Sequence, residues 1–360
     1  MDQVATTLDS LPVIGVFFQL LGYLVATVPE IAPIFVALAA PIALGALCGI
    51  MNERSGVVNI GIEGMMLSSA FTAFLVAAMV AQAMGPMSPS PLFGVTVPII
   101  AGVVAAVAMG MLVSALHAWL SISIQADQII SGTIINILAF GLTGYLNRLV
   151  ISPNPRLGAG ILQPLVPPAS LVDLPMVGWV IKAFFAHGPI AISVLFLVVF
   201  LQIWLFRTRW GLRTRAVGEH PKAAETVGID VIRVRYRNVI LGGVFAGLAG
   251  AYLTLEQSGS FQNGMTSGRG FIALAAVIFG RWTPIGAFGA ALLFTASEAL
   301  RVAISLSPPG GQLGDVIRFI PAEFYGALPY FVTLVVLVAA AGKSVAPAAV
   351  GKPYVREART

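Results

Sequence analysis

Successive apolar segments, each close to the length of one membrane crossing, restrict the fold of this chain more than any other feature. A helix needs roughly 20 mainly apolar residues to cross the hydrocarbon core of a bilayer. Only 10% of the 360 residues are charged and 58% are hydrophobic, whereas a soluble domain carries about 25% charged residues. We therefore expect an all-α polytopic membrane protein with about ten transmembrane segments. They fall at residues 11–28, 31–51, 57–83, 94–120, 128–150, 189–206, 238–255, 271–282, 285–304 and 319–341.

Two of these segments are irregular, one in each half of the chain. Residues 271–282 are too few to cross a bilayer alone, and the segment that begins at residue 57 starts with Asn59, Gly61 and Glu63. Short or glycine-interrupted segments in both halves of a transporter are typical of broken helices at a binding site. A buried half-helix with only a packing role is the alternative. We expect both segments to be broken or re-entrant.

Basic residues gather in the connection at residues 207–237. The positive-inside rule predicts that such a loop is cytoplasmic, and we expect the basic tail at residues 343–360 on the same side. This divides the chain into a transmembrane domain at residues 1–342 and a cytoplasmic tail. A nucleic-acid surface would spread basic residues over one face of a folded domain, so we expect no nucleic acid partner despite the net charge of +5.

Within the basic loop, residues 221–227 have the pattern of a short helix of about two turns. Pro221 suits the first helical position, Ala223 and Ala224 favour helix, and Gly228 can end it in the left-handed conformation. So short a helix is only marginally stable in water. We expect it to dock on its own bundle or on a partner.

Polar side chains inside the apolar segments are the candidates for a path through the membrane, because they usually face a cavity or a partner there. Asn59 and Glu63 lie one helical turn apart, so we expect both on one helix face. Their amide and carboxylate groups could bind a polar solute or instead cap and brace a broken helix, and the sequence leaves both roles open. Gln128 and Asn136 are weaker candidates, and Phe271 could stack on a ring or simply pack.

Other spacings have structural explanations. Glu298 and Arg301 stand three residues apart, so they are predicted to pair on one helix face. Gly243 and Gly247 form a GxxxG pattern, which lets two membrane helices approach closely.

The sequence offers no pattern for a metal site, a catalytic centre or an ATP site. The single cysteine, Cys48, lies in an apolar segment, and no paired catalytic set is present. Residues 342–344 resemble the end of a P-loop, but Leu337 stands where its first glycine should be. We expect no metal, no cofactor and no enzymatic activity. The histidines are far apart and lack zinc-site spacing: His117, His187 and His220.

Four blocks of the sequence resemble those of a known family, the permease subunits of ABC importers for nucleosides, ribose-type sugars and branched-chain amino acids. The third block in the order below resembles the coupling-helix loop of that family, and the fourth resembles nucleoside-type members most closely. Together the blocks extend the likeness over about residues 30–340. They are ERSGVVNIGIEGMM at 53–66, ADQIISGTIINIL at 126–138, RTRAVGEHPKAAETVGI at 213–229 and GMTSGRGFIALAAVIFG at 264–280.

The resemblance implies an importer in the bacterial plasma (inner) membrane. Its parts would be two permease subunits, usually different chains in nucleoside-type systems, together with separate ATPase subunits and a substrate-binding lipoprotein or periplasmic binding protein. The cargo would be purine and pyrimidine nucleosides, whose hydroxyls and base edges suit the polar groups named above. Contact with the ATPase is implied for Arg215, Gly218, Glu219, Pro221, Ala223, Ala224 and Gly228. The candidates for the pathway remain the residues chosen above from their place in the apolar segments: Asn59, Glu63, Gln128, Asn136 and Phe271.

Two alternatives remain beside this interpretation. The same class of importer could carry ribose or another simple sugar. An ion-coupled secondary transporter would explain the number of apolar segments and the buried charges, but it would have no use for a cytoplasmic docking helix.

Overall fold

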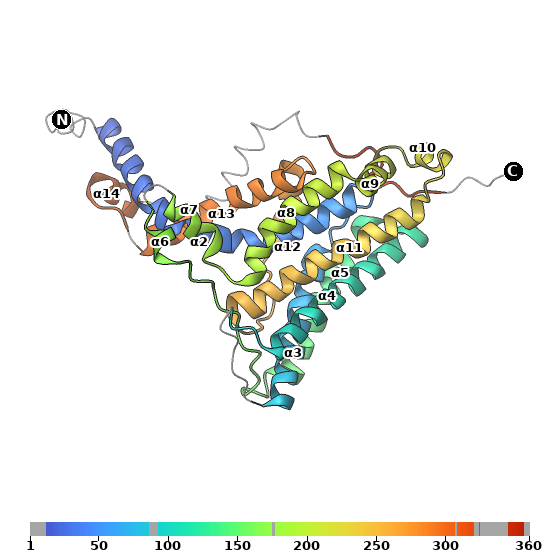
Figure 1. The fold of residues 1–360 in the computed structure, drawn as a ribbon, viewed down its shortest axis with the longest axis horizontal. Helices are drawn as coiled ribbons and strands as arrows, with labels where there is room; N and C mark the ends of the chain where they lie inside the picture. Colours follow the sequence, from blue (N-terminus) through green and yellow to red (C-terminus); the bar gives the residue numbers. More distant parts are fainter. Residues whose placement is uncertain are drawn as a thin grey trace. The chain divides into compact units, whose positions relative to one another are not determined.

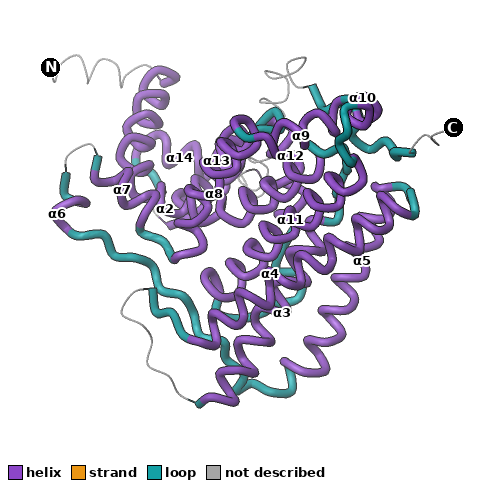
Figure 2. Tube along the Cα trace, turned by 45° about the vertical axis from the view of Figure 1, so that its right-hand side comes forward, coloured by secondary structure: helices purple, strands orange, loops and turns teal. Residues whose placement is uncertain are grey.

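The computed structural model (Figure 1) describes residues 12–85, 93–174, 177–306, 308–319, 324 and 345–355. Across these ranges the chain forms helices joined by loops and contains no strand (Figure 2). The expected all-α class is confirmed for this part of the chain. The helices are α2 (Pro12–Glu53), α3 (Ile62–Met84), α4 (Val97–Ala118), α5 (Gln128–Leu146), α6 (Ala169–Val172), α7 (Gly178–Phe185), α8 (Pro189–Arg207), α9 (Arg209–Glu219), α10 (Pro221–Thr226), α11 (Val231–Ala251), α12 (Arg269–Phe279), α13 (Pro284–Leu306) and α14 (Gly311–Phe319), with π-helical turns at Trp119–Ser123, Asn147–Ile151 and Tyr252–Ser258.

The chain divides into two compact units, each made of discontinuous stretches. The first consists of residues 1–38, 166–186 and 292–339. The second consists of residues 39–165, 187–291 and 340–360. In the second unit α3, α4 and α11 pack against one another, and α5 lies along α3 (Figure 1). All candidate coupling and pathway residues belong to this second unit.

Close contact between α4 and α11 depends on glycine. A Cβ added to Gly110 of α4 would lie 2.7 Å from the backbone nitrogen of Gly247, and it would also overlap the carbonyl oxygen of Gly243. No side chain other than hydrogen fits there, so the two backbones meet directly. The close approach predicted from the GxxxG pattern is confirmed.

Seven helices within the described ranges are long and apolar enough to cross a membrane. The expectation of about ten crossings is therefore not confirmed. The segment expected at 271–282 forms the short helix α12, which falls below the length of a crossing, and a re-entrant path for it is not confirmed. The segment expected at 319–341 lies almost wholly outside the described residues.

The two segments expected at 11–28 and 31–51 differ most from the prediction, because they form the single helix α2 of 42 residues. Pro29 and Pro33 lie inside this helix. Proline removes one backbone hydrogen bond from a helix, but lipid offers the backbone no partner outside the helix. The chain therefore remains helical where the sequence predicts a boundary.

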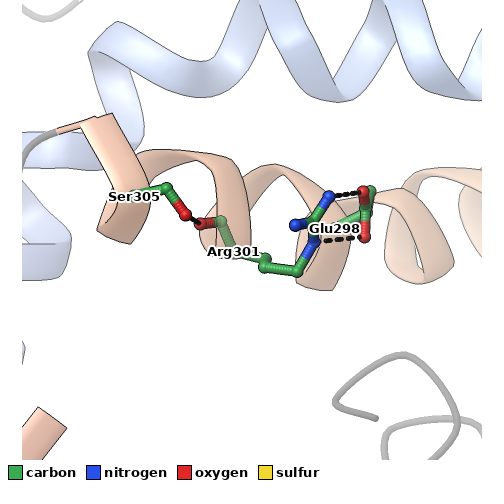
Figure 3. A network of polar contacts seen from close by, with 3 residues as sticks. All are labelled: Glu298, Arg301 and Ser305. Atoms are coloured by element: carbon green, nitrogen blue, oxygen red, sulfur yellow. Dashed lines mark hydrogen bonds and ion pairs between the residues drawn. The ribbon is translucent and has the colours of Figure 1, made fainter. Parts of the chain in front are cut away.

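In the first unit, Glu298 and Arg301 form the predicted ion pair on α13 (Figure 3). The Arg301 Nε donates to Glu298 Oε2 at 3.0 Å, and a second guanidinium nitrogen donates to Oε1 at 2.5 Å. The Ser305 hydroxyl donates to the Arg301 carbonyl oxygen at 2.9 Å. Both charged side chains are partly exposed, so the pair contributes only about 0–1 kcal/mol.

Candidate functional site: the basic loop and the broken segment before α3

The first part of the basic loop forms two helices, α9 and α10, whereas residues 231–237, which were expected to be loop, are the start of α11 (Figure 1). Pro221 begins α10, and Gly228 follows it with φ +83°, in the left-handed region that suits glycine. The short helix predicted at 221–227 is thus confirmed, although it ends at Thr226. It docks on its own chain through a cluster of buried residues: Val217, Ala224, Val231, Val234 and Tyr354.

The residues expected to contact the ATPase differ in exposure. Gly218 and Ala224 are buried within the chain. Ala223 and Gly228 are exposed, and Val227, which follows the last residue of α10, is 74% exposed. Val227 was not among the residues singled out from the sequence.

Gly218 contacts the non-helical residues 54–61 between α2 and α3, which we name the broken segment before α3. A Cβ on Gly218 would overlap the carbonyl oxygen of Arg54, so the two backbones are in direct contact. The Arg54 Nε donates to the Trp282 carbonyl oxygen at 2.9 Å. Burial lowers the pKa of the Arg54 guanidinium, while the nearby Glu219 carboxylate favours the charged form. The end of α9 therefore rests on the backbone of Arg54, a half-buried residue between α2 and α3.

The other coupling candidates are held by contacts within the chain. The guanidinium of Arg215 lies 5.1 Å from the centroid of the Phe206 ring, within the range of a cation–π interaction. The Glu219 Oε2 accepts a hydrogen bond from the Ala348 backbone nitrogen at 3.1 Å. These two side chains stabilise the loop whether or not a partner is present.

Asn59 and Glu63 do not share a helix face, because α3 begins only at Ile62 and Asn59 lies in the preceding turn. The Asn59 Oδ1 accepts from the Gly61 nitrogen at 3.0 Å. The Glu63 carboxylate accepts from the Gly268 nitrogen at 2.7 Å and the Gly270 nitrogen at 2.6 Å. A carboxylate at a helix N-terminus satisfies backbone donors that have no partner in the helix. Glu63 thus makes a capping contact of the kind that the sequence had left open, whereas Asn59 bonds within the segment that precedes α3.

Gln128 and Asn136 hold the same segment from α5. The Gln128 Oε1 accepts from the Val58 nitrogen at 2.7 Å. The Asn136 Oδ1 accepts from the Gly64 nitrogen at 2.7 Å, and its Nδ2 donates to the Ile60 carbonyl oxygen at 3.0 Å. The unwound backbone before α3 is therefore fixed by side chains of a neighbouring helix, which satisfy groups that lipid cannot.

His117 of α4 completes this arrangement, and sequence reasoning missed it. Its Nε2 lies 2.9 Å from the Val58 carbonyl oxygen and its Nδ1 lies 3.1 Å from the Ser131 hydroxyl. A histidine inside an apolar segment satisfies the same criterion that singled out Glu63, so the signal was present. Phe271 differs from the other candidates, because its side chain is 49% exposed on α12.

The arrangement holds the non-helical stretch between α2 and α3 and connects it to the basic loop. Among the described residues, no three His, Cys, Asp or Glu side chains come together to hold a metal ion. Glu256 follows the pattern of Glu63, since its carboxylate accepts from the Ile190 and Ala191 nitrogens at the start of α8, at 2.7 and 3.0 Å.

Comparison with known proteins places most of the chain within one family. Residues 32–340 match the family described as the branched-chain amino acid transport system permease component. The guanosine ABC transporter permease protein NupQ of Bacillus subtilis (strain 168) is 38% identical over 91% of this chain and 97% of its own length. The nucleoside ABC transporter permease protein NupC of Lactococcus lactis subsp. cremoris (strain MG1363) is 37% identical, over 88% and 94%.

A third relative carries a different name. The putative glucose ABC transporter permease protein TsgC13 of Haloferax volcanii is 35% identical over 83% of this chain and 88% of its own length. The search of solved structures found no match. The family match and the extent of these relatives agree with the four blocks and with the apolar helices. The chain therefore belongs to the branched-chain amino acid transport system permease family, as a multi-pass membrane permease of an ABC transporter.

Proposed function

We propose that this chain is one of two permease subunits of an ATP-driven nucleoside importer in the bacterial plasma membrane. The observation that carries the proposal is the extent of similarity to two permeases named for guanosine and for nucleosides, which spans 97% and 94% of their lengths. A separate ATPase supplies the energy, and a binding protein delivers the solute. The second permease is a different chain of the same family. The basic loop at 207–237 and the C-terminal tail face the cytoplasm.

The exposed side of α10 contacts the ATPase in this proposal. Ala223 of α10 and Val227, which follows its last residue, are both open to solvent, while Ala224 packs in the buried cluster. A small apolar surface on a short helix suits a groove on a partner. Movement of the ATPase would therefore be received at α10 and passed to α9.

The next link is the contact between Gly218 and the Arg54 carbonyl oxygen, which connects α9 to the broken segment before α3. That segment is bound by Gln128 and Asn136 of α5, and Glu63 binds the start of α12. We infer that a displacement of α10 changes the relative positions of α3, α5 and α12. Such a change would open the pathway to one side of the membrane and close it to the other.

Import of a simple sugar is the second candidate, and one observation favours it. TsgC13, whose name refers to glucose, is 35% identical over most of its length, close to the values for the two nucleoside-type relatives. Nucleosides and sugars share hydroxyl groups, so amide and carboxylate side chains suit both.

Uptake by intact cells tests the proposal. Cells with and without this gene are supplied with labelled guanosine or labelled glucose, and the experiment is repeated with the ATPase subunit inactivated. We expect ATPase-dependent guanosine uptake that excess glucose does not reduce. Uptake of glucose alone would replace the substrate and keep the importer, while uptake that survives loss of the ATPase would refute the importer itself.

A further inference from the structure

The C-terminal segment 345–355, which we name the C-terminal strap, lies beside the basic loop although more than a hundred residues separate them in sequence. It is drawn at the red end of the colour scale next to α9 and α10 (Figure 1). The Ala349 nitrogen donates to the Gly218 carbonyl oxygen at 2.9 Å. The Ala348 nitrogen donates to Glu219 Oε2 at 3.1 Å. The strap thus binds the end of α9 through its backbone.

Tyr354 binds the strap to α10. Its ring is buried in the apolar cluster that contains Val217 and Ala224. Its hydroxyl is hydrogen-bonded to the Glu225 carboxylate of α10. Its carbonyl oxygen accepts from the Gln125 Nε2 at 3.2 Å. Of the strap residues, Tyr354 is the one that packs in the cluster holding α10.

Arg235 of α11 connects the strap to the broken segment before α3. This side chain is only 1% exposed, and its Nη1 donates to the Lys352 carbonyl oxygen at 3.0 Å. Its guanidinium lies 5.9 Å from the centroid of the Tyr354 ring. Gly56 lies against the same guanidinium, because a Cβ there would be 2.7 Å from Nη2. The strap and the broken segment therefore meet around one buried arginine, and Tyr354 links this contact to α10.

We propose that Tyr354 is a positioning residue of the coupling apparatus, and that the strap makes α10 move together with the broken segment before α3. This inference rests on the proposed function, in which α10 receives the motion of the ATPase. A helix of six residues has little rigidity of its own. Tyr354 supplies the aromatic ring of the cluster on which α10 packs. Without that ring α10 would tilt on its loop, and its movement would no longer displace Gly218.

The test uses the complete complex of this chain, its partner permease, the ATPase and the binding protein, reconstituted in liposomes. Guanosine transported per ATP hydrolysed is measured for Tyr354→Ala, Tyr354→Phe and Val355→Ala. Val355 is the matched control, because it is the adjacent strap residue and is 64% exposed. A defect of folding alone lowers the amount of complex, but it does not change the transport ratio of the complex that assembles.

We expect Tyr354→Ala to assemble and hydrolyse ATP but to lower the transport ratio by about fivefold or more, because it removes both the packing beneath α10 and the hydrogen bond to Glu225. Tyr354→Phe keeps the ring and loses only the hydrogen bond to the Glu225 carboxylate, so it should lower the ratio by less than Tyr354→Ala does. Val355→Ala should match the wild type.

An unchanged ratio in assembled Tyr354→Ala would overturn the inference. If Tyr354→Ala does not assemble, a wild-type ratio in Tyr354→Phe would overturn it instead. A wild-type complex that carries neither guanosine nor glucose would refute the proposed function and this inference together, so the two failures are distinguishable.

Discussion

Replacing Glu63 by glutamine tests whether this carboxylate holds the membrane helices together. Glu63 accepts two backbone hydrogen bonds from the start of α12, at 2.7 and 2.6 Å. Glutamine retains one acceptor oxygen but turns an NH₂ donor toward the second N–H group. Hydrogen bonds to a charged group contribute about 1.5–3 kcal/mol each, and an unpaired buried donor costs a similar amount. We expect Glu63→Gln to lower the free energy of unfolding by about 2–4 kcal/mol.

The assay is unfolding of the purified protein in detergent micelles by increasing SDS, followed by tryptophan fluorescence. Glu298→Gln makes the same chemical change in a partly exposed pair, so it should alter the free energy of unfolding by no more than about 1 kcal/mol. A Glu63→Gln protein within about 0.5 kcal/mol of the wild type, combined with lost uptake, would refute the capping role. Glu63 would then act on the solute.

Three further changes probe the packing and the docking surface. Gly110→Val should greatly reduce the yield of folded protein, because the larger side chain would separate α4 from α11. Gly141→Val on α5 should not, because no atom lies within 4 Å of its added Cβ. Size-exclusion chromatography in detergent compares the two yields, and equal yields would contradict the packing argument. Val227→Asp should weaken co-purification of the ATPase about tenfold or more, while Leu212→Asp, at an exposed position of α9, should leave it intact. Loss in both variants or in neither would exclude the α10 region as the contact. Gly228→Ala should lower the free energy of unfolding in the SDS assay by about 1–2 kcal/mol. Its φ is +83°, and no atom lies within 4 Å of an added Cβ, so backbone strain is the expected cause.

Several local features were predictable because their causes lie within a few residues. Pro221 and Gly228 delimit α10 in the structure as the residues alone suggest, since one fixes φ and the other permits a positive φ. Glu298 and Arg301 pair because they are three residues apart on one helix. The helix boundary expected near Pro29 is wrong. The tendency of proline to interrupt a helix is a local preference, and a membrane environment favours an unbroken helix.

The candidate site was predictable in composition and unpredictable in geometry. Asn59, Glu63, Gln128 and Asn136 were identified as polar groups in an apolar setting, and they do gather at the break before α3. Their partners could not be inferred, because the donors to Glu63 lie 205 and 207 residues away. For the same reason the sequence could not show which coupling candidates are buried. Gly218 and Ala224 are buried, whereas Ala223 and Gly228 are exposed.

A helical membrane protein of the permease family, with a basic loop that carries a short helix, could be predicted from the order of the residues. Apolar length, charge distribution and the four blocks are properties of the chain read in order, so no structure was needed for them. The capping of α12 by Glu63 and the binding of residues 345–355 to the basic loop through Tyr354 became visible in the folded chain alone. Contacts between segments far apart in sequence depend on how helices pack, and packing leaves no periodic pattern in either segment alone.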